Sequence, residues 1–209
     1  MEGYNQDNTA DSGELARDWA GLISECLRNI LSRLSLEDRW LGAMLVCKAW
    51  LQECKDPTLN SVLDLETNFD SVTELPRFWT PEFESRIDNV IISVVGWSNG
   101  SLSEIRVRHC SDRSLSLVAR RDGNLEAAAI GNSMPHLLQL ELQFSKLMGV
   151  GLDLICEGCL DLEYIDLSGC RSVSRRAIEN AKSKLKKLEI KKPNIYITRS
   201  VLRWERHDY

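Results

Sequence analysis

The chain has 209 residues, of which 43% are hydrophobic, and this is enough apolar material for a folded core. A formal net charge of −5 argues against a dedicated nucleic-acid-binding protein, and apolar runs such as residues 90–95 are too short to cross a bilayer. Seven irregularly spaced cysteines argue against a disulfide framework, and residues 1–16 lack a signal-peptide core. We therefore expect a protein of the nucleus and/or cytoplasm, with no membrane and no nucleic-acid partner.

Three short helices are predicted to follow a disordered tail at residues 1–16. The first is indicated by apolar residues at the i, i+3, i+4 and i+7 spacing of one helix face, namely Leu27, Ile30, Leu31 and Leu34. Ser35 is placed to cap the second helix, and the Asp38 carboxylate three residues on can reach back to a free N–H. The third helix would end at Asp56-Pro57. Such a small unit usually needs a partner or a neighbouring domain.

Residues 61–100 are predicted to link this unit to the C-terminal half of the chain and to contain one capping helix. Residues 61–65 could form a short strand. Thr80 followed by Pro81 is typical of a helix start, with threonine as the N-cap and proline at the first helical position. Apolar residues beginning at Phe83 supply one face of that helix, and Gly96 is expected to end it.

From residue 101 the sequence repeats the leucine-rich-repeat strand template, L-x-x-L-x-L-x-x-C. Its copies are Leu102, Ile105, Val107 and Cys110; Leu137, Leu140, Leu142 and Ser145; Leu162, Ile165, Leu167 and Cys170; and, in part, Leu185, Leu188 and Ile190. Apolar residues between the copies would form the returning helices. The sequence therefore predicts a chain of the α+β or α/β-solenoid class, in which parallel strands and helices alternate. The repeats would occupy residues 101–197 and a tail residues 198–209.

The first repeat interval is unequal to the others. Leu102 and Leu137 are 35 residues apart, whereas Leu137, Leu162 and Leu185 are separated by 25 and 23. One repeat takes about 20–29 residues, so 35 is too long for one and too short for two. We predict that internal repeats are missing near Arg121, which leaves at most four strands, poor stacking at the join and mobile residues at 119–131. The alternative is an enlarged loop within an intact array.

Polar side chains alternate with the strand leucines and are therefore predicted to share the concave face of the solenoid, where repeat proteins commonly bind partners. The residues proposed to bind a protein substrate are Arg106, Arg108, Glu141, Gln143, Tyr164, Asp166 and Glu189. One residue from each strand, Arg106, Glu141, Asp166 and Glu189, is expected to align in a row. The alternative for any single member is an ordinary solvated position.

Other motifs favour structural interpretations. Cys156 and Cys159 form a lone C-x-x-C pair, whereas a structural zinc site needs four ligands, so no metal is expected. His109 and Cys110 adjoin, but neighbours on a strand point to opposite faces, which argues against a catalytic pair. A lysine run at residues 182–192 is interrupted at strand spacing, which favours a solvated edge over a nuclear-localisation or nucleic-acid role.

Residues 17–60 resemble the F-box, and the chain from about 17 to 192 is similar to plant F-box/leucine-rich-repeat proteins of the Skp-interacting-partner type. The matching positions are Trp19, Leu22, Glu25, Leu27, Ile30, Leu31, Leu34, Asp38, Val46, Cys47, Lys48, Trp50, Asp56, Pro57 and Leu59. The family usually carries proline where this chain has Ile23.

The resemblance implies a non-catalytic receptor subunit of a Skp–cullin–F-box ubiquitin ligase. It would dock to a Skp adaptor, and through it to a cullin, and hold an unknown protein substrate on its repeats, without a cofactor. The adaptor-binding residues that it implies are Leu22, Leu27, Ile30, Leu31 and Leu34. The alternative is a repeat scaffold that binds proteins but has no ligase role, its F-box degenerate at Ile23.

Overall fold

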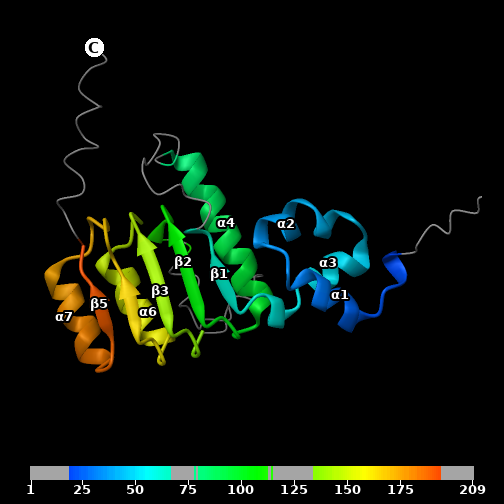
Figure 1. Ribbon diagram of the computed structural model, residues 1–209. Coiled ribbons are helices and arrows are strands. Elements are labelled where there is room, and N and C mark those ends of the chain that lie inside the picture. The colour runs from blue at the N-terminus through cyan, green and yellow to red at the C-terminus, as the bar shows by residue number, and fades with distance from the viewer. Residues whose placement is uncertain (1–18, 67–77, 79, 113, 115–133, 194–209) are drawn as a thin grey trace, which may run out of the picture.

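The computed structural model describes residues 19–66, 78, 80–112, 114 and 134–193. A small helical unit stands at one end of a parallel sheet, next to strand β1, and the chain then advances strand by strand to the far end at β5 (Figure 1). The sheet order is β1-β2-β3-β4-β5, with every neighbouring pair parallel. This sequential parallel order is the arrangement that a solenoid of strand-and-helix repeats produces. The predicted tails at 1–16 and 198–209 lie outside the described residues.

The helical unit has its own small core. Its elements are η1 (Trp19–Gly21), α1 (Ser24–Leu31), α2 (Leu36–Leu41), η2 (Ala43–Leu45), α3 (Lys48–Cys54) and η3 (Pro57–Leu59). The fully enclosed side chains are Leu27, Leu31, Ala43 and Cys54. As predicted, the Ser35 side chain caps α2 by accepting a hydrogen bond from the Asp38 N–H. A core of this size leaves the unit dependent on its neighbours for stability.

The sheet begins directly where the helical unit ends. Strand β1 (Val62–Asp64) pairs with β2 (Glu104–Arg108), and Leu63 lies opposite Ile105. Asn60 takes the place of the first leucine of the repeat: it is buried, and its side-chain amide donates hydrogen bonds to the carbonyls of Cys54 and Asp56. The short strand expected at residues 61–65 is confirmed, and the prediction of at most four strands in the solenoid is wrong because this strand adds a fifth.

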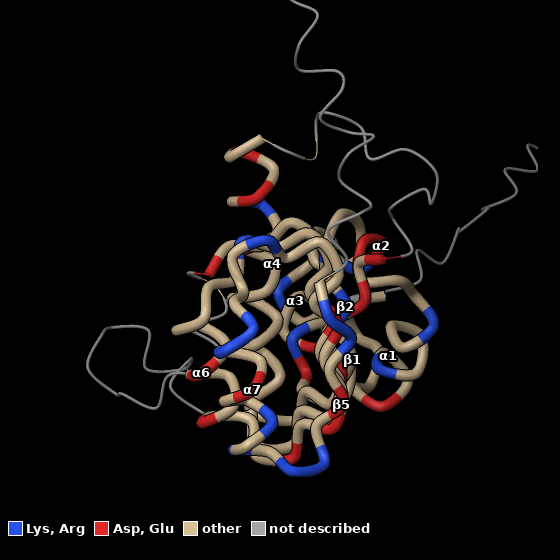
Figure 2. Tube along the Cα trace, turned by 90° about the vertical axis from the view of Figure 1, so that its left-hand side faces the viewer, with Lys and Arg blue, Asp and Glu red and all other residues tan. Residues whose placement is uncertain are grey.

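Strands β3 (Gln139–Gln143) and β4 (Tyr164–Asp166) confirm the repeat template. The inward leucine and isoleucine positions are fully buried, and Ile105, Leu140 and Ile165 lie side by side in register. Helices α6 (Gly149–Gly158) and α7 (Arg175–Lys184) return along one face of the sheet. Seen from the β5 end, these helices and α4 lie on one side and the strands on the other (Figure 2).

The prediction for the last copy of the template is wrong in its register. In the structure Leu185 caps the C-terminus of α7, just as Cys159 caps that of α6. Ile190 of β5 (Glu189–Lys191), not Leu188, lies opposite Ile165. The strand therefore starts later than the L-x-x-L spacing suggested, because that spacing here spans a helix end and the turn after it.

Helix α4 (Pro81–Ser98) comes after β1 in the chain and packs on the sheet. Thr80 caps it by accepting a hydrogen bond from the Phe83 N–H, and Pro81 stands at its first turn, as predicted. The expectation that Gly96 ends the helix is wrong, since the helix continues to Ser98 and stops at Asn99, which has the left-handed φ of 48°. Asparagine tolerates that conformation better than most side chains do.

The strands on either side of the unequal interval are well paired. Five residue pairs, from Glu104 opposite Gln139 to Arg108 opposite Gln143, join β2 and β3, and the Cys110 thiol lies 3.0 Å from the Ser145 hydroxyl oxygen. The prediction of poor stacking at the join is therefore wrong for the strands. The predicted join near Arg121 and all of residues 119–131 fall in the range 115–133, outside the described residues.

Candidate adaptor and substrate surfaces

The helical unit exposes an unusual amount of apolar surface. Among the described residues, the exposed large apolar side chains of this unit are Trp19, Ile23, Ile30, Leu41, Leu45 and Val46. Leu45 is the most open of them at 77% exposure, and Ile23 is 66% exposed. Single exposed apolar residues need no explanation, but this many on a unit of three short helices marks a surface that another protein covers.

The structure separates the predicted adaptor contacts into three groups. Leu27 and Leu31 are only 1% and 0% exposed, so they are core residues of the free chain and have no surface to offer a partner. Leu22 and Leu34 are half-buried against the same core, and Ile30 alone is exposed. Leu45 and Val46 were not predicted as adaptor contacts; they belong to the short 3-10 turn η2 and its end.

The N-terminal edge of α1 is fixed from two sides. The indole N–H of Trp50 donates a hydrogen bond to the carbonyl of Trp19, 3.0 Å away, which ties η1 to α3. Arg28 on α1 makes ion pairs with Glu53 and Asp56 at 3.2 and 3.6 Å. Trp50 thus acts in internal packing. The exposed Ile23 is held between these anchored elements.

The helical unit is joined to the repeats by an aromatic contact. The ring of Trp40 on α2 packs at a centroid distance of 5.0 Å against Trp97 near the end of α4, and Trp40 and Leu36 also contact the repeat core. The Lys55 ammonium lies 5.8 Å from the centre of the Trp97 ring. Side chains of both units interdigitate here, so whatever binds the helical unit is held in a defined position relative to the sheet.

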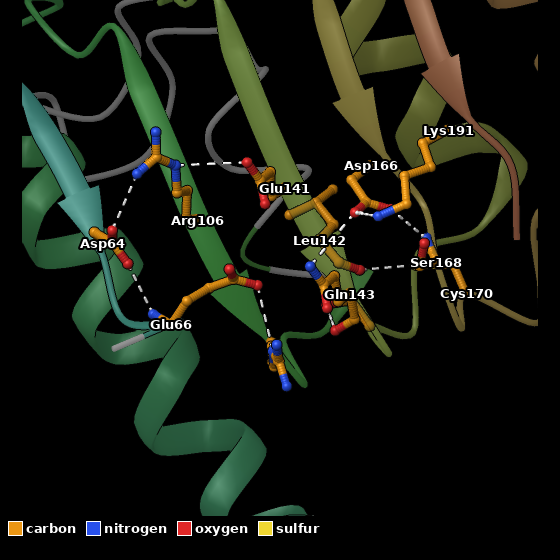
Figure 3. A network of polar contacts seen from close by, with 12 residues as sticks. Asp64, Glu66, Arg106, Glu141, Leu142, Gln143, Asp166, Ser168, Cys170 and Lys191 are labelled. Atoms are coloured by element: carbon orange, nitrogen blue, oxygen red, sulfur yellow. Dashed lines mark hydrogen bonds and ion pairs between the residues drawn. The ribbon is translucent and has the colours of Figure 1, made fainter. Parts of the chain in front are cut away.

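The strands present one polar face, which we call the polar sheet face. Its members alternate with the buried leucines and are Asp64, Glu66, Glu104, Arg106, Arg108, Gln139, Glu141, Gln143, Tyr164, Asp166, Ser168, Glu189 and Lys191. They include all seven predicted substrate-binding residues. Figure 3 shows two linked groups of these residues: Asp64, Glu66, Arg106 and Glu141 toward β1, and Gln143, Asp166 and Lys191 toward β5.

Arg106 is the centre of the first half of this network. Its guanidinium contacts three carboxylates, Asp64 at 3.2 Å, Glu104 at 2.7 Å and Glu141 at 3.5 Å. Partial burial disfavours the charged form, but the hydrogen bond to Asp64 and the negative charges around it outweigh that effect and raise the pKa of Arg106. The guanidinium therefore stays charged and links carboxylates on strands β1, β2 and β3.

Asp166 and Lys191 form the second half. The Asp166 side chain is 1% exposed, and it accepts hydrogen bonds from the Lys191 ammonium at 2.8 Å and from the Ser168 N–H. Burial alone would raise the pKa of this carboxyl, but these hydrogen bonds reverse the effect and lower it, while that of Lys191 is raised by the same pair. Asp166 thus orients Lys191 and Ser168 but exposes almost no surface of its own to a partner.

The predicted row across the strands needs one correction. Arg106, Glu141 and Asp166 do lie opposite one another, but the residue next in line on β5 is Lys191. Glu189 lies opposite Tyr164, one row further toward the strand starts. The error arises from the misplaced strand at β5, which also explains why Lys191 was not predicted. Asp64 and Glu66 were not predicted because the short strand expected at residues 61–65 was assigned to the linker instead of the repeat array.

An aromatic stack lines the ends of the strands. His109 and Phe144 occupy equivalent positions after β2 and β3 with φ values of 57° and 55°, and their rings stack 5.9 Å apart. Burial, with the nearby charge of Arg108, lowers the pKa of His109 to about 4, so the ring is neutral at physiological pH. Gly169 is the next equivalent, and a Cβ there would collide with the Phe144 ring. The stack is therefore structural.

The buried cysteines of the repeats are poor nucleophiles, because their thiols stay protonated. Burial raises the pKa of Cys156 to about 11 and those of Cys159 and Cys170 to about 12, so all three are protonated thiols at neutral pH. Cys110 also has a raised pKa because of burial. Within the described part of the chain, no cluster of three or more His, Cys, Asp or Glu side chains could hold a metal ion.

Comparison with known proteins identifies both parts of the chain. The F-box domain family matches residues 19–61, which are the helical unit. The chain is 37% identical to the F-box protein SKIP1 of Arabidopsis thaliana, over 88% of this chain and 89% of that protein. It is 36% identical to the putative F-box/LRR-repeat protein 19 of the same plant, over 89% and 91%.

A helical F-box followed by a parallel-strand repeat sheet defines an F-box protein of the leucine-rich-repeat class. The chain belongs to the plant F-box/leucine-rich-repeat family. F-box proteins are typically non-catalytic subunits of ubiquitin ligases, and an F-box implies binding to a Skp adaptor. Among the described residues, no helix has the length and apolar character needed to span a bilayer.

Proposed function

We propose that this chain is the substrate receptor of a Skp–cullin–F-box ubiquitin ligase in the nucleus and/or cytoplasm. Its F-box binds a Skp adaptor and through it a cullin, and its polar sheet face captures a protein for ubiquitination. The observation that carries the proposal is the pairing of two surfaces: an exposed apolar surface on the F-box, and an open polar face on a sheet fixed to it through Trp40 and Trp97.

Such a receptor needs no bond-making group of its own. Holding the substrate in a fixed position relative to the adaptor raises its effective concentration at the conjugating enzyme, and proximity of this kind can accelerate a transfer by several orders of magnitude. The polar sheet face is built from charged and amide side chains on rigid strands, which suits recognition of another protein rather than chemistry on it.

We infer that internal repeats are missing between β2 and β3, so that the solenoid is shorter than those of its relatives. The match to SKIP1 runs over 268 aligned positions, more than the 209 residues of this chain. Given the share of this chain that it covers, roughly 80 positions of the relative have no counterpart here, the length of about three repeats. The wide interval between Leu102 and Leu137 is the natural place for the loss. We expect a narrower substrate surface than the relatives have.

A repeat scaffold without ligase function is the competing proposal, and it depends on Ile23 disabling the F-box. The backbone argues against that. Ile23 has φ −63° and ψ 141°, values that proline itself adopts, so the proline of related F-boxes would leave the chain path unchanged. Ile23 also adds to the exposed apolar surface instead of removing from it.

The proposal is tested by the proteins that accumulate when the gene is deleted. A true substrate rises in abundance, falls when the wild-type chain is restored, and stays high when the restored chain carries Leu45→Asp and Val46→Asp. The matched control carries Met148→Asp and Val150→Asp, an equally exposed apolar pair outside the F-box, and should behave as wild type. If the F-box variant lowers the same proteins as well as wild type does, the chain acts as a scaffold.

A further inference from the structure

The polar sheet face carries an excess of negative charge. Its carboxylates are Asp64, Glu66, Glu104, Glu141, Asp166 and Glu189, and its cations are Arg106, Arg108 and Lys191. Six acids against three bases leave a net charge of −3 on this face. We propose that it recognises a basic segment of a protein, rich in lysine and arginine; this rests on the receptor function and specifies its substrate class.

Each base on the face is already neutralised within the sheet. Arg108 pairs with Glu66 at 3.3 Å, Lys191 with Asp166 at 2.8 Å, and Arg106 with three carboxylates at once. An anionic partner would have to break these pairs before it gained any contact. A cationic partner meets carboxylates that outnumber their internal partners, above all around Arg106, where one guanidinium is shared by Asp64, Glu104 and Glu141.

The row nearest the strand starts offers the most accessible contacts. Glu189 is exposed, makes no ion pair with any described residue, and lies directly opposite Tyr164. Tyr164 is half-buried, and its strand partner on the other side is Gln139. A phenol ring beside a carboxylate can bind a lysine or arginine side chain through the ring face and the charge together. Glu104 lies in the same row on β2, next to Val62 at the row's end on β1, and supplies a second carboxylate.

The dimensions suit a short extended segment. Five strands about 4.8 Å apart span roughly 20 Å, the length that about six extended residues cover. Basic side chains along such a segment would meet Glu104 near one end and Glu189 near the other. The face is thus large enough for a recognition motif but too small for a whole folded domain to be held by it alone.

The test measures peptide binding to the full chain in complex with a Skp adaptor. The probes are two fluorescent peptides of about ten residues, one rich in lysine and arginine and one rich in aspartate and glutamate. The variant is Glu104→Gln, Glu141→Gln and Glu189→Gln together. The matched control is Glu82→Gln, Glu157→Gln and Glu179→Gln, which removes the same charge from helices α4, α6 and α7 on the other side of the sheet.

The basic probe should bind, the acidic one should not, and raising the salt concentration should weaken binding. The triple variant should bind the basic probe about tenfold more weakly, and the control variant as wild type does. Equal binding of both probes, no binding of the basic probe, or an unaffected triple variant overturns the inference. Adaptor binding in the same samples reports separately on the receptor function, which stands if the adaptor binds and the basic probe does not.

Discussion

Replacing Leu27 by alanine should by itself destabilise the fold of the F-box, because the Leu27 side chain is part of its core. Leu27 is 1% exposed and belongs to a core that, among the described residues, has three other buried members. Leucine-to-alanine changes at such sites cost about 2–5 kcal/mol, so we expect about 3 kcal/mol here. Ile30, three residues on along the same helix, is 39% exposed, and its replacement by alanine should cost less than about 1 kcal/mol.

Amide hydrogen exchange of the full chain, read over α1 and α3, measures this difference directly. A loss of about 3 kcal/mol speeds exchange from these helices about 100-fold, since each 1.4 kcal/mol is a factor of ten in an equilibrium constant. Strands β2 to β4 should be nearly unaffected in both variants, because the repeats have their own core. Comparable exchange in the Leu27 and Ile30 variants would refute the division into core and surface residues.

Three further changes probe the rest of the chain. Asp166→Asn should lower the free energy of unfolding by about 1–3 kcal/mol at pH 7. Because the folded-state pKa of this carboxyl is lowered, the stability difference between wild type and variant, measured by chemical unfolding, should be fully present above pH 5 and should shrink as the pH falls through that pKa. Gly169→Ala should destabilise the fold by more than about 1 kcal/mol. Adding Phe144→Ala should recover only part of the lost stability in thermal melts, because the φ of 76° at residue 169 remains unfavourable for alanine. Full recovery would show that only the clash with the Phe144 ring mattered. Ile23→Pro should leave stability unchanged or raise it by up to about 1 kcal/mol while keeping adaptor binding, and an unfolded variant would contradict the backbone assignment.

The inward side of the repeats could be predicted because strand alternation fixes it. Once Ile105, Leu140 and Ile165 are recognised as repeat positions, their burial and the exposure of the residues between them result from the pleat. That the polar residues of these strands share one face of the sheet was therefore predictable from sequence. Which residues lie opposite one another across the strands was not predictable, because that depends on where each strand begins. At β5 the spacing of Leu185 and Leu188 matches the strand template, although Leu185 lies at the end of helix α7.

The F-box shows a second limit of pattern reading. A stripe such as Leu27, Ile30 and Leu31 identifies a buried helix face but does not say which of its members the small core can enclose. Leu45 and Val46 are exposed because they lie at the end of a 3-10 turn, which has no apolar periodicity to detect. Asn60 departs from the repeat template at β1, since a buried amide stands where the template has leucine, and the strand was therefore not counted among the repeats.

The dissociation constant between the full chain and a plant Skp adaptor, measured by calorimetry, is the most direct test of the receptor assignment. Apolar anchors at protein interfaces contribute about 2 kcal/mol or more each, so the Leu45→Asp, Val46→Asp variant should bind at least about 100-fold more weakly than wild type. The Met148→Asp, Val150→Asp variant should bind as wild type does. A wild-type chain that fails to bind the adaptor, or an F-box variant that binds it unchanged while remaining folded, would contradict the assignment.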